Sequence, residues 1–359
     1  MYFERLPSGN WLVTVRHSGQ RRSGSGPTKS AAAHVGAELL LEMGAAPKVA
    51  KITVGELLEE WFAASKLANN YRVDAQRVVD RLPVEFAGRR LADVTPSVIE
   101  GLYRQLDREG WTAHRIIRIH KVLSSAYTLA RRYEWAIVNP FSAAKPPTVK
   151  RASIDPPSRA QVAQLITAAD ERLTLYLGVS AMLGARRGEV VALQWDDLTD
   201  DAIIVRRALS YAPGFGVTAT DGKIDDKGHR VVAIDPQLVS WLRAHRINQV
   251  GLALAAGTPK PVWVFSHDAG VTPWRPDFAT REFAKLRATC GLPESVKMKN
   301  LRHYVATQLL AAGVPLYVVG KRLGHRQLAT TSDVYGSFVP AADREATDVL
   351  ASIRDTHIR

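Results

Sequence analysis

The chain of 359 residues is poor in cysteine, in long apolar runs and in acidic charge. Cys290 is its only cysteine, which excludes an internal disulfide and a cysteine-based metal site. No apolar run is long enough to span a bilayer, and the opening MYFERLPSGNWLVTV lacks the charged-then-apolar layout of a signal peptide. These absences disfavour a secreted or membrane-embedded protein, and we expect an intracellular one.

Basic residues outnumber acidic ones. The sequence holds 48 lysines and arginines against 35 aspartates and glutamates, a formal net charge of +13. A protein this basic commonly binds a polyanion, with nucleic acid the first candidate and an acidic membrane surface the second. The sequence has no basic amphipathic anchor, so nucleic acid is favoured over membrane. The hydrophobic fraction of 46% is that of a globular protein and suffices for more than one core.

The zone 1–48 combines strand and helix signals. Alternating, strand-like runs are separated by turn signals, and a short helix capped by Thr28 or Ser30 follows and ends at Gly44. This pattern predicts a small module of a sheet and one helix. Its basic residues predict a DNA-binding face, although a solvated hairpin with scattered charge is an equally good explanation. The residues of that face are Arg16, Arg21, Arg22 and Lys29.

The zone 49–145 is predicted to be helical. Its apolar residues recur at three- and four-residue spacing in several stretches, the last of them at 112–135. Basic residues on the polar side of that stretch suggest phosphate contacts, with plain solvation as the alternative. The expected contacts are Arg115, Arg118 and Lys121.

A proline-rich segment and a long C-terminal zone complete the chain. Prolines concentrated within 139–159 predict an extended linker at 146–157. The zone 158–359, with a C-terminal tail, opens with a helix capped by Ser158, passes through a strand-like section at 202–234 and returns to helix. We therefore expect a multidomain fold, mainly α with small β elements: a sheet-plus-helix module, a helical domain and a mixed, mostly α domain.

Two arginine-containing motifs in the C-terminal zone suit a phosphate. In GARRGE, Arg186 and Arg187 lie at a junction between two helical runs, where a rigidly held guanidinium matches phosphate geometry. An ion pair of one of the arginines in this motif with Glu189 or Asp196 is the structural alternative. In NLRHY, Arg302 and His303 lie near the start of a helix, where the helix dipole favours an anion.

A histidine and a tyrosine follow in LGHRQLATTSDVYGSF. Tyr335 offers a nucleophilic oxygen, the arginines can neutralise phosphoryl oxygens, and a lysine or His325 can protonate the leaving oxygen. Such a set performs phosphoryl transfer without a metal. Singly, a tyrosine is more often a packed aromatic and such a histidine a helix cap, so these two residues by themselves do not establish catalysis.

Taken together, GARRGE, NLRHYVATQLLAAGVPLYVVGKRLGH and TTSDVY closely resemble the tyrosine recombinases, and among them the phage-type integrases. The resemblance implies that Arg186 and Arg302 are the catalytic arginines, His325 the catalytic histidine and Tyr335 the nucleophile. It gives supporting roles to two neighbours of the arginines, Glu189 and His303. For the N-terminal zones it implies an arm-type DNA-binding module followed by a core-binding, SAM-like domain, and for 158–359 a tyrosine-recombinase catalytic domain.

The family also has a catalytic lysine on a β-hairpin. The matching region is TATDGKIDDKGHRVVAID, in which Lys223 is preferred over Lys227. One position departs from the family pattern, because Lys299 stands where the H-x-L-R motif has its histidine. A lysine can donate a hydrogen bond to a phosphate, but it is no neutral base unless its pKa is strongly depressed. We expect Lys299 in the site, with an altered part in proton transfer.

The resemblance implies a site-specific recombinase that cuts and rejoins DNA through a 3′-phosphotyrosyl intermediate without metal, ATP or another cofactor. It would integrate or excise a phage or mobile element in the cytoplasm of a bacterial host. Expected partners are double-stranded DNA with core and arm sites, further copies in a homotetramer, a DNA-bending host factor and a directionality factor. Two alternatives stay open: a type IB topoisomerase, and a non-catalytic DNA-binding protein, which Lys299 favours and Tyr335 opposes.

Overall fold

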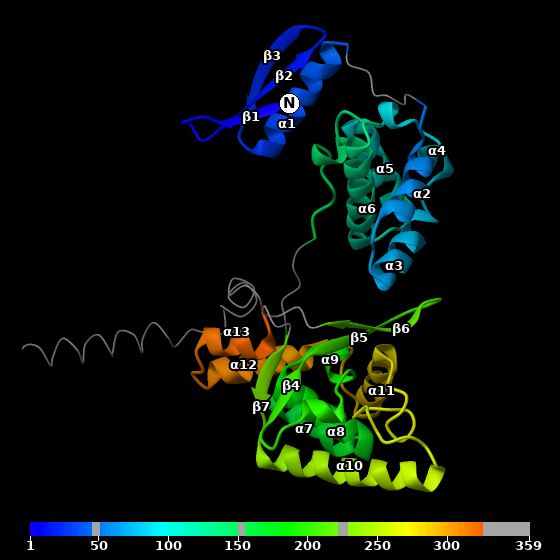
Figure 1. Ribbon diagram of the computed structural model, residues 1–359, viewed down its shortest axis with the longest axis vertical. Coiled ribbons are helices and arrows are strands. Elements are labelled where there is room, and N and C mark those ends of the chain that lie inside the picture. The colour runs from blue at the N-terminus through cyan, green and yellow to red at the C-terminus, as the bar shows by residue number, and fades with distance from the viewer. Residues whose placement is uncertain (45–50, 150–154, 222–228, 326–359) are drawn as a thin grey trace, which may run out of the picture. The chain divides into compact units, whose positions relative to one another are not determined.

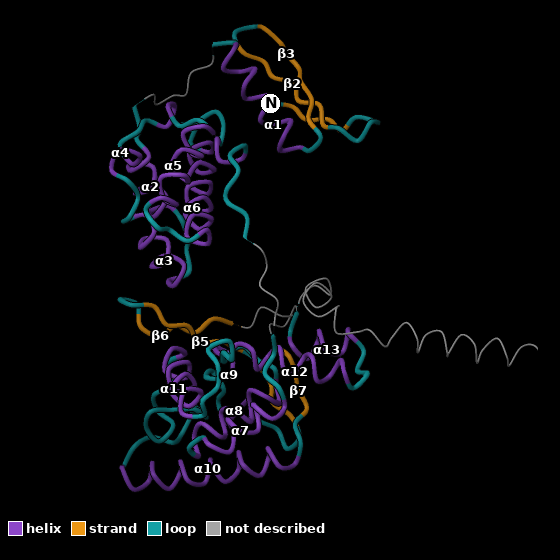
Figure 2. The backbone as a smooth tube through the Cα atoms, turned by 180° about the vertical axis from the view of Figure 1, so that it is seen from behind, coloured by secondary structure: helices purple, strands orange, loops and turns teal. Residues whose placement is uncertain are grey.

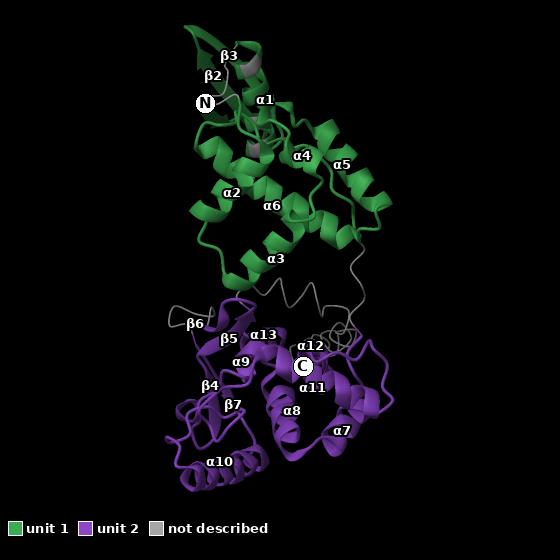
Figure 3. Ribbon diagram, turned by 90° about the vertical axis from the view of Figure 1, so that its right-hand side faces the viewer, with its two compact units in different colours: residues 1–151 green, residues 152–359 purple. Residues whose placement is uncertain are grey.

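The computed structural model, shown in Figure 1, describes residues 1–44, 51–149, 155–221 and 229–325. Helices dominate, and the described strands form only small sheets (Figure 2). The chain divides into two compact units, residues 1–151 and 152–359 (Figure 3). The expected fold class, multidomain and mainly α with small β elements, is confirmed.

An antiparallel sheet and one helix form the N-terminal module. Its elements, with strand order β1-β2-β3, are β1 (Tyr2–Arg5), β2 (Trp11–His17), β3 (Gln20–Gly26) and α1 (Lys29–Glu42). Val13 and Val15 are fully buried, because alternate residues of β2 face α1. A Cβ on Gly36 of α1 would lie 2.6 Å from Val13 Cγ2, so the glycine lets the helix approach the sheet closely. Thr28 caps the helix by accepting the Ala31 amide at 3.1 Å.

Residues 51–149 form a helical domain with its own apolar cluster, separate from that of the module. Its elements are α2 (Val54–Ala64), α3 (Asn69–Val79), α4 (Val84–Ala87), η1 (Leu91–Asp93), α5 (Pro96–Arg108), α6 (Ala113–Arg132) and η2 (Pro140–Ser142). Helix α6 is central, because Ile119, Val122 and Leu123 are fully buried and α2, α3 and α5 pack on it. The apolar spacing that predicts these helices thus marks the faces that build the core.

The second unit packs its helices around α8. Its helical elements are α7 (Arg159–Ala168), α8 (Glu171–Leu183), α9 (Arg187–Val190), η3 (Trp195–Asp197), α10 (Pro236–Ala256), α11 (Pro276–Thr289), α12 (Lys299–Ala311) and α13 (Leu316–Leu323). Tyr176, Val179 and Leu183 of α8 are fully buried, with α7, α10 and α12 packed on this helix. Ser158 caps α7 through a capping box with Gln161, as the sequence predicts. No described helix is long and apolar enough to cross a membrane.

Two strand pairs connect these helices. The strands are β4 (Ala202–Val205), β5 (Arg207–Ala212), β6 (Gly216–Asp221) and β7 (Arg230–Ala233). Within the described residues β4 pairs with β7 and β5 with β6, both antiparallel. Strand β5 packs on α9, and β7 packs on α13. Helix α12 packs on α8 and α13, so the end of α8, α9, the start of α12 and the end of α13 meet at one corner of the unit. We call it the arginine corner, after Arg186, Arg230 and Arg302.

Candidate active site

The end of α8 is a tight junction that requires glycine. Gly184 has a φ of +59°, and a Cβ there would lie 2.6 Å from Leu323 Cδ2 and 3.1 Å from Val305 Cγ1. Gly188 in α9 is similarly confined, since its Cβ would lie 2.5 Å from the carbonyl oxygen of Leu209 on β5. The two glycines of GARRGE therefore let this segment lie against α12, α13 and β5, which fixes the backbone between them.

Arg186 is held by Glu189 while about half of its side chain stays exposed. The Glu189 carboxylate accepts the Arg186 amide at 2.8 Å and Arg186 Nη1 at 3.0 Å. The Arg186 side chain is 52% exposed and that of Glu189 only 8%. The ion pair considered as the structural alternative is thus present, and it orients the arginine without burying it.

A second arginine, Arg230 at the start of β7, binds Glu189 from its other side. Its Nη2 donates to Glu189 Oε2 at 2.8 Å, and its Nε donates to the backbone oxygen of Arg322 at 3.0 Å. Burial alone would raise the pKa of Glu189, but the hydrogen bonds and charges of Arg230 and Arg186 outweigh it and lower that pKa. Glu189 is therefore ionised at neutral pH and holds both arginines.

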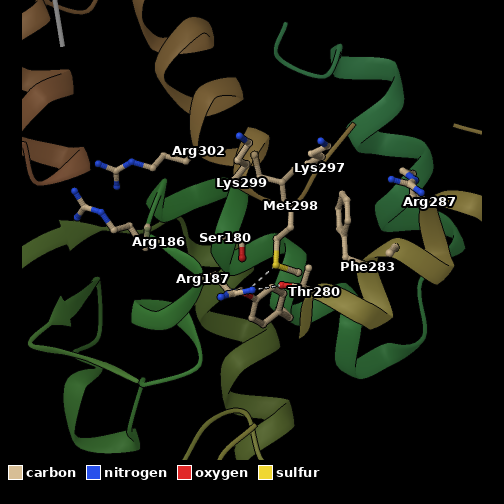
Figure 4. A pocket seen from close by; sticks show the side chains of 14 residues that line it. Ser180, Arg186, Arg187, Thr280, Phe283, Arg287, Lys297, Met298, Lys299 and Arg302 are labelled. Carbon is tan, nitrogen blue, oxygen red and sulfur yellow. Dashed lines mark hydrogen bonds between the residues drawn. The ribbon is translucent and has the colours of Figure 1, made fainter. Parts of the chain in front are cut away.

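Arg302 reaches the same junction from α12. Its Nη1 donates to the carbonyl oxygen of Gly184 at 2.8 Å, shortly before Arg186 in the chain. Arg302 lies near the start of α12, where the helix N-terminus adds positive potential. In Figure 4 the side chains of Arg186 and Arg302 extend to the same side. The two arginine motifs thus contribute adjacent cations from two different helices.

His325 belongs to the same corner. It follows Gly324, which closes α13 with a φ of +74°, and its amide donates to the Gly320 carbonyl at 3.0 Å. Partial burial, together with the charges of the nearby arginines, lowers the pKa of His325 to about 4. Burial and the charges of Arg302 and Lys299 also lower the pKa of His303. Both imidazoles are neutral at pH 7, so each can accept a proton as well as donate a hydrogen bond.

A pocket of 440 Å³ lies beside the two arginines (Figure 4). Its apolar lining includes Tyr176, Phe283 and Met298. Further cations line it next to Arg186 and Arg302, namely Arg187, Arg287, Lys297 and Lys299. Lys299 is exposed on the first turn of α12. A pocket with this many cations suits a polyanion.

The predicted site residues within the described part of the chain lie together. Arg186, Glu189, Arg302 and His325 meet at the arginine corner, and Lys299 and His303 stand beside Arg302. The predicted nucleophile and both candidates for the hairpin lysine lie outside the described residues. They are Tyr335, Lys223 and Lys227.

The basic residues of the N-terminal module fall on two faces. Arg16 and Arg21 are exposed cross-strand partners on the face of the sheet away from α1. Arg22 instead pairs with Glu42 of α1 at 3.0 Å. The Lys29 ammonium lies over two aromatic rings of the module, 5.4 and 5.5 Å from their centroids. Arg22 and Lys29 thus have partners within the module, whereas Arg16 and Arg21 face each other as like charges.

A groove of 590 Å³ on the helical domain runs between α3 and the start of α6. Arg115 and Arg118, both predicted to contact DNA, line it, and Arg118 pairs there with an aspartate of α3 at 2.5 Å. Lys121 is exposed farther along α6. Arg77 and Arg81 also line the groove, and sequence analysis missed them because they lie at the end of a helix without a repeated basic face.

Sequence analysis also missed the residues whose hydrogen bonds hold the segments of the arginine corner together. Besides Arg230, these include Arg322, whose Nη2 donates to the carbonyl oxygens of Met182 at 2.7 Å and Ala233 at 3.1 Å. The sequence carries no local signal for Arg230, because the strand reads RVVA and only its packing buries Arg230 while leaving Val231 exposed. An arginine at an inward-facing strand position requires a buried partner.

Comparisons with known proteins bear on this site. Residues 158–337 match the model of the Phage integrase family. The chain is 23% identical over 334 residues to the "Tyrosine recombinase XerC-like" protein of Caldanaerobacter subterraneus subsp. tengcongensis, covering 83% of each chain. It is 28% identical over 186 residues to the ICEBs1 integrase of Bacillus subtilis, covering 49% of this chain and 47% of that one.

Solved structures share the fold. The Tn1549 transposon integrase in complex with transposon right end DNA matches with a TM-score of 0.70 at 18% identity, over 84% of this chain and 100% of that one. A lambda integrase tetramer bound to a Holliday junction matches with a TM-score of 0.59 at 16% identity, over 92% and 94% of the two chains.

The family match begins at the cap of α7 and extends beyond Tyr335. It therefore includes both arginine motifs, the histidine and the tyrosine on which the resemblance rested, and that resemblance is confirmed. The chain belongs to the phage integrase family and is a tyrosine recombinase, an enzyme that cuts DNA strands and rejoins them.

Proposed function

We propose that this recombinase integrates or excises a phage or another mobile element at specific DNA sites. The observation that carries the proposal is the convergence of Arg186, Arg302 and His325 at the arginine corner, with both arginines fixed and lining a cationic pocket. A phosphodiester placed there meets two oriented guanidinium groups and a neutral imidazole. Three similar proteins are named as integrases, one of them of a transposon, which supports integration as the reaction.

In the first step the Tyr335 hydroxyl attacks the scissile phosphorus. The bond from phosphorus to the 5′-oxygen breaks, and a 3′-phosphotyrosyl ester forms. Arg186 and Arg302 donate to the non-bridging oxygens, where negative charge builds up, and one preorganised donor of this kind accelerates a reaction about 10²- to 10³-fold. Because Glu189 and the Gly184 carbonyl already hold the two arginines, little reorganisation is needed.

Two proton transfers accompany this step. Lys223, or Lys227 in its place, gives a proton to the departing 5′-oxygen. The tyrosine hydroxyl loses a proton, which neutral His325 can accept, or else His325 donates a hydrogen bond to the phosphate. Lys299 supplies another donor to that phosphate, but an ammonium has no acceptor, so it does not replace a neutral histidine as a base.

In the second step the 5′-hydroxyl of a partner strand attacks the phosphotyrosyl bond. This restores the tyrosine and forms a new phosphodiester, so one ester replaces another and no ATP is required. Exchange between two duplexes requires four strands to be cut and rejoined, which a homotetramer on DNA can perform. The tetrameric assembly of the lambda integrase on a junction supports this arrangement.

The N-terminal zones extend the contact with DNA. The proposed parts are an arm-binding module at 1–48, a core-binding domain at 49–145, a linker at 146–157 and a catalytic domain at 158–359. Arg16 and Arg21 oppose each other across two strands, an arrangement of like charges that costs stability until a polyanion neutralises it. A DNA-bending host factor and a directionality factor are further proposed partners, and the bacterial cytoplasm is the proposed location.

The test is capture of the covalent intermediate. The Tyr335→Phe variant first selects binding sites from a pool of random-sequence duplexes. A selected duplex is nicked near the crossover point, so that the released strand diffuses away, and is incubated with wild-type protein in EDTA. A denaturing gel should show a protein–DNA adduct with wild type and none with Tyr335→Phe.

Two other results would point to the alternative functions. No adduct on a duplex that the protein demonstrably binds would indicate a non-catalytic DNA-binding protein. An adduct together with relaxation of supercoiled DNA, but without joining of two duplexes, would indicate a type IB topoisomerase.

A further inference from the structure

Arg230 touches several of the segments that build the active site. Its strand β7 comes shortly after the candidate lysines Lys223 and Lys227 in the sequence. Its Nη2 donates to Glu189 on α9 at 2.8 Å. Its Nε donates to the carbonyl oxygen of Arg322 on α13 at 3.0 Å, shortly before His325. One guanidinium therefore connects β7, the first arginine motif and the helix that leads to the histidine.

The contact with α13 is itself braced. Arg322 donates to the carbonyl oxygen of Met182 in the last turn of α8 at 2.7 Å, and to that of Ala233 on β7 at 3.1 Å. Arg230 and Arg322 thus tie β7, α13 and the end of α8 to one another. A shift of Arg230 would therefore change the positions of all three elements.

The burial of Arg230 is costly. Its side chain is 6% exposed, and its Nη1 has no hydrogen-bond partner in the described part of the chain. A buried guanidinium loses its hydration and recovers that loss only where all its donors are satisfied. An apolar pair in place of both Arg230 and Glu189 would avoid this loss, so stability alone is a poor explanation for a buried ion pair here.

We propose that Arg230 is a positioning residue of the recombination reaction. Through Glu189 it orients the guanidinium of Arg186, and through the Arg322 carbonyl it fixes the end of α13 that precedes His325. It acts through these groups and does not contact the DNA. The inference rests on the proposed function, since it requires Arg186 to bind the scissile phosphate.

Three variants of the full-length chain isolate this role. Arg230→Met keeps the length of the side chain and removes its donors. Arg230→Lys keeps a charge beside Glu189 but lacks the planar fork that binds Glu189 and the Arg322 carbonyl together. Arg243→Met is the matched control, because the Arg243 side chain is 66% exposed and pairs with an aspartate that is 98% exposed.

Each variant is assayed in single turnover on two nicked duplexes of the same selected sequence. One has an ordinary scissile phosphate, and the other a methylphosphonate, in which a methyl group replaces a non-bridging oxygen and removes the charge. A neutral centre depends less on a well-placed Arg186. A defect caused by a misplaced guanidinium therefore shrinks on the methylphosphonate, whereas a defect caused by a loosened fold does not.

We expect Arg230→Met to cleave the phosphate duplex about 100-fold more slowly than wild type, because a misplacement of about 1 Å has an effect of that size. Its Kd for the duplex should stay within about 3-fold of wild type, since the lost interaction acts in the transition state. The deficit should shrink to less than about 10-fold on the methylphosphonate. Arg230→Lys should lie between Arg230→Met and wild type, and Arg243→Met should match wild type.

Equal deficits on the two duplexes would overturn the inference, and so would a rate for Arg230→Met equal to that of Arg243→Met. If thermal unfolding shows that Arg230→Met does not fold, Arg230→Lys is judged by the same two criteria. Failure of the proposed function looks different, because wild type itself would then form no Tyr335-dependent adduct.

Discussion

Replacement of Glu189 by glutamine should destabilise the catalytic unit far more than replacement of an exposed carboxylate in the same unit. The Glu189 carboxylate accepts two hydrogen bonds from Arg186 and one from Arg230, and its side chain is 8% exposed. A glutamine of the same shape can still accept from the Arg186 amide. It leaves the buried charge of Arg230 without a counter-ion.

The magnitude follows from the burial of the two arginines. Removal of one partner from a buried ion pair costs about 3–5 kcal/mol, because the remaining charge is uncompensated. Arg230 belongs to this class, since its side chain is 6% exposed. The Arg186 side chain is 52% exposed, so water compensates most of its loss and it adds little. We therefore expect a loss of about 3 kcal/mol in the free energy of unfolding.

Native-state hydrogen exchange is the assay, because it reports on the two units separately. Amides in the middle of α8 report on the catalytic unit, and amides in α6 provide an internal reference. Asp200→Asn is the matched control, since the Asp200 side chain is 98% exposed. Asp200→Asn should leave the protection of both helices unchanged, and Glu189→Gln should lower it in α8 alone.

The pH dependence provides a second check. The pKa of Glu189 is lowered from the ordinary value of 4.5, so its contribution to stability is fully present above pH 4.5 and is lost as the pH falls through the lower pKa of the folded state. The difference between wild type and Glu189→Gln should narrow in that acidic range. If Glu189→Gln cost no more protection than Asp200→Asn at pH 7, Glu189 would not be the clamp on both arginines that the structure indicates.

Arg302→Ala should lower the single-turnover cleavage rate about 10²- to 10³-fold and leave DNA binding nearly unchanged; a loss confined to binding would contradict a role in the transition state. In an NMR titration of the free protein, His325 should titrate near pH 4 instead of the ordinary 6.5. Because the unfolded chain takes up that proton first, His325 should destabilise the fold progressively as the pH falls from 6.5 to 4. A titration midpoint near pH 6.5 would show that burial and the arginine charges do not lower the pKa of His325. Gly188→Ala should destabilise the catalytic unit by about 1–3 kcal/mol through contact with the Leu209 carbonyl oxygen. Gly251→Ala, on α10 with nothing within 4 Å of its Cβ, should stabilise the catalytic unit by up to about 1 kcal/mol. Thermal unfolding measures both variants, and shifts of the same sign in the two midpoints would refute the packing argument.

The helices were predictable because their signals are local. Neighbouring residues predict the cap at Ser158 and narrow the first cap to Thr28 or Ser30, of which the structure shows Thr28. Apolar spacing predicts the helix that contains Arg302. The grouping of Arg186 with Arg302 came from the order of the motifs, which the fold brings to one junction. Local pattern and family motif together thus predicted the chemical groups of the site.

Partners distant in the sequence were not predictable. Nothing in the local pattern separates Arg22, which pairs with Glu42 of another element, from Arg21, which does not. Arg230 binds Glu189 across 41 positions, so its role as a buried clamp depends on how β7 packs beside α9 and α13. These contacts are set by tertiary packing, which a periodicity of two or of 3.6 residues does not encode.

The most direct test of the central claim is mass spectrometry of the covalent intermediate formed on the nicked duplex. Trypsin cuts after Arg326 and Arg344, and Tyr335 is the only tyrosine in the peptide 327–344. After digestion with nuclease and trypsin, we predict a nucleotide 3′-phosphate on that peptide, with fragment ions that place it on Tyr335. A nucleotide attached to any other residue, or none on a duplex that the protein binds, would contradict the claim that this recombinase cuts DNA through Tyr335.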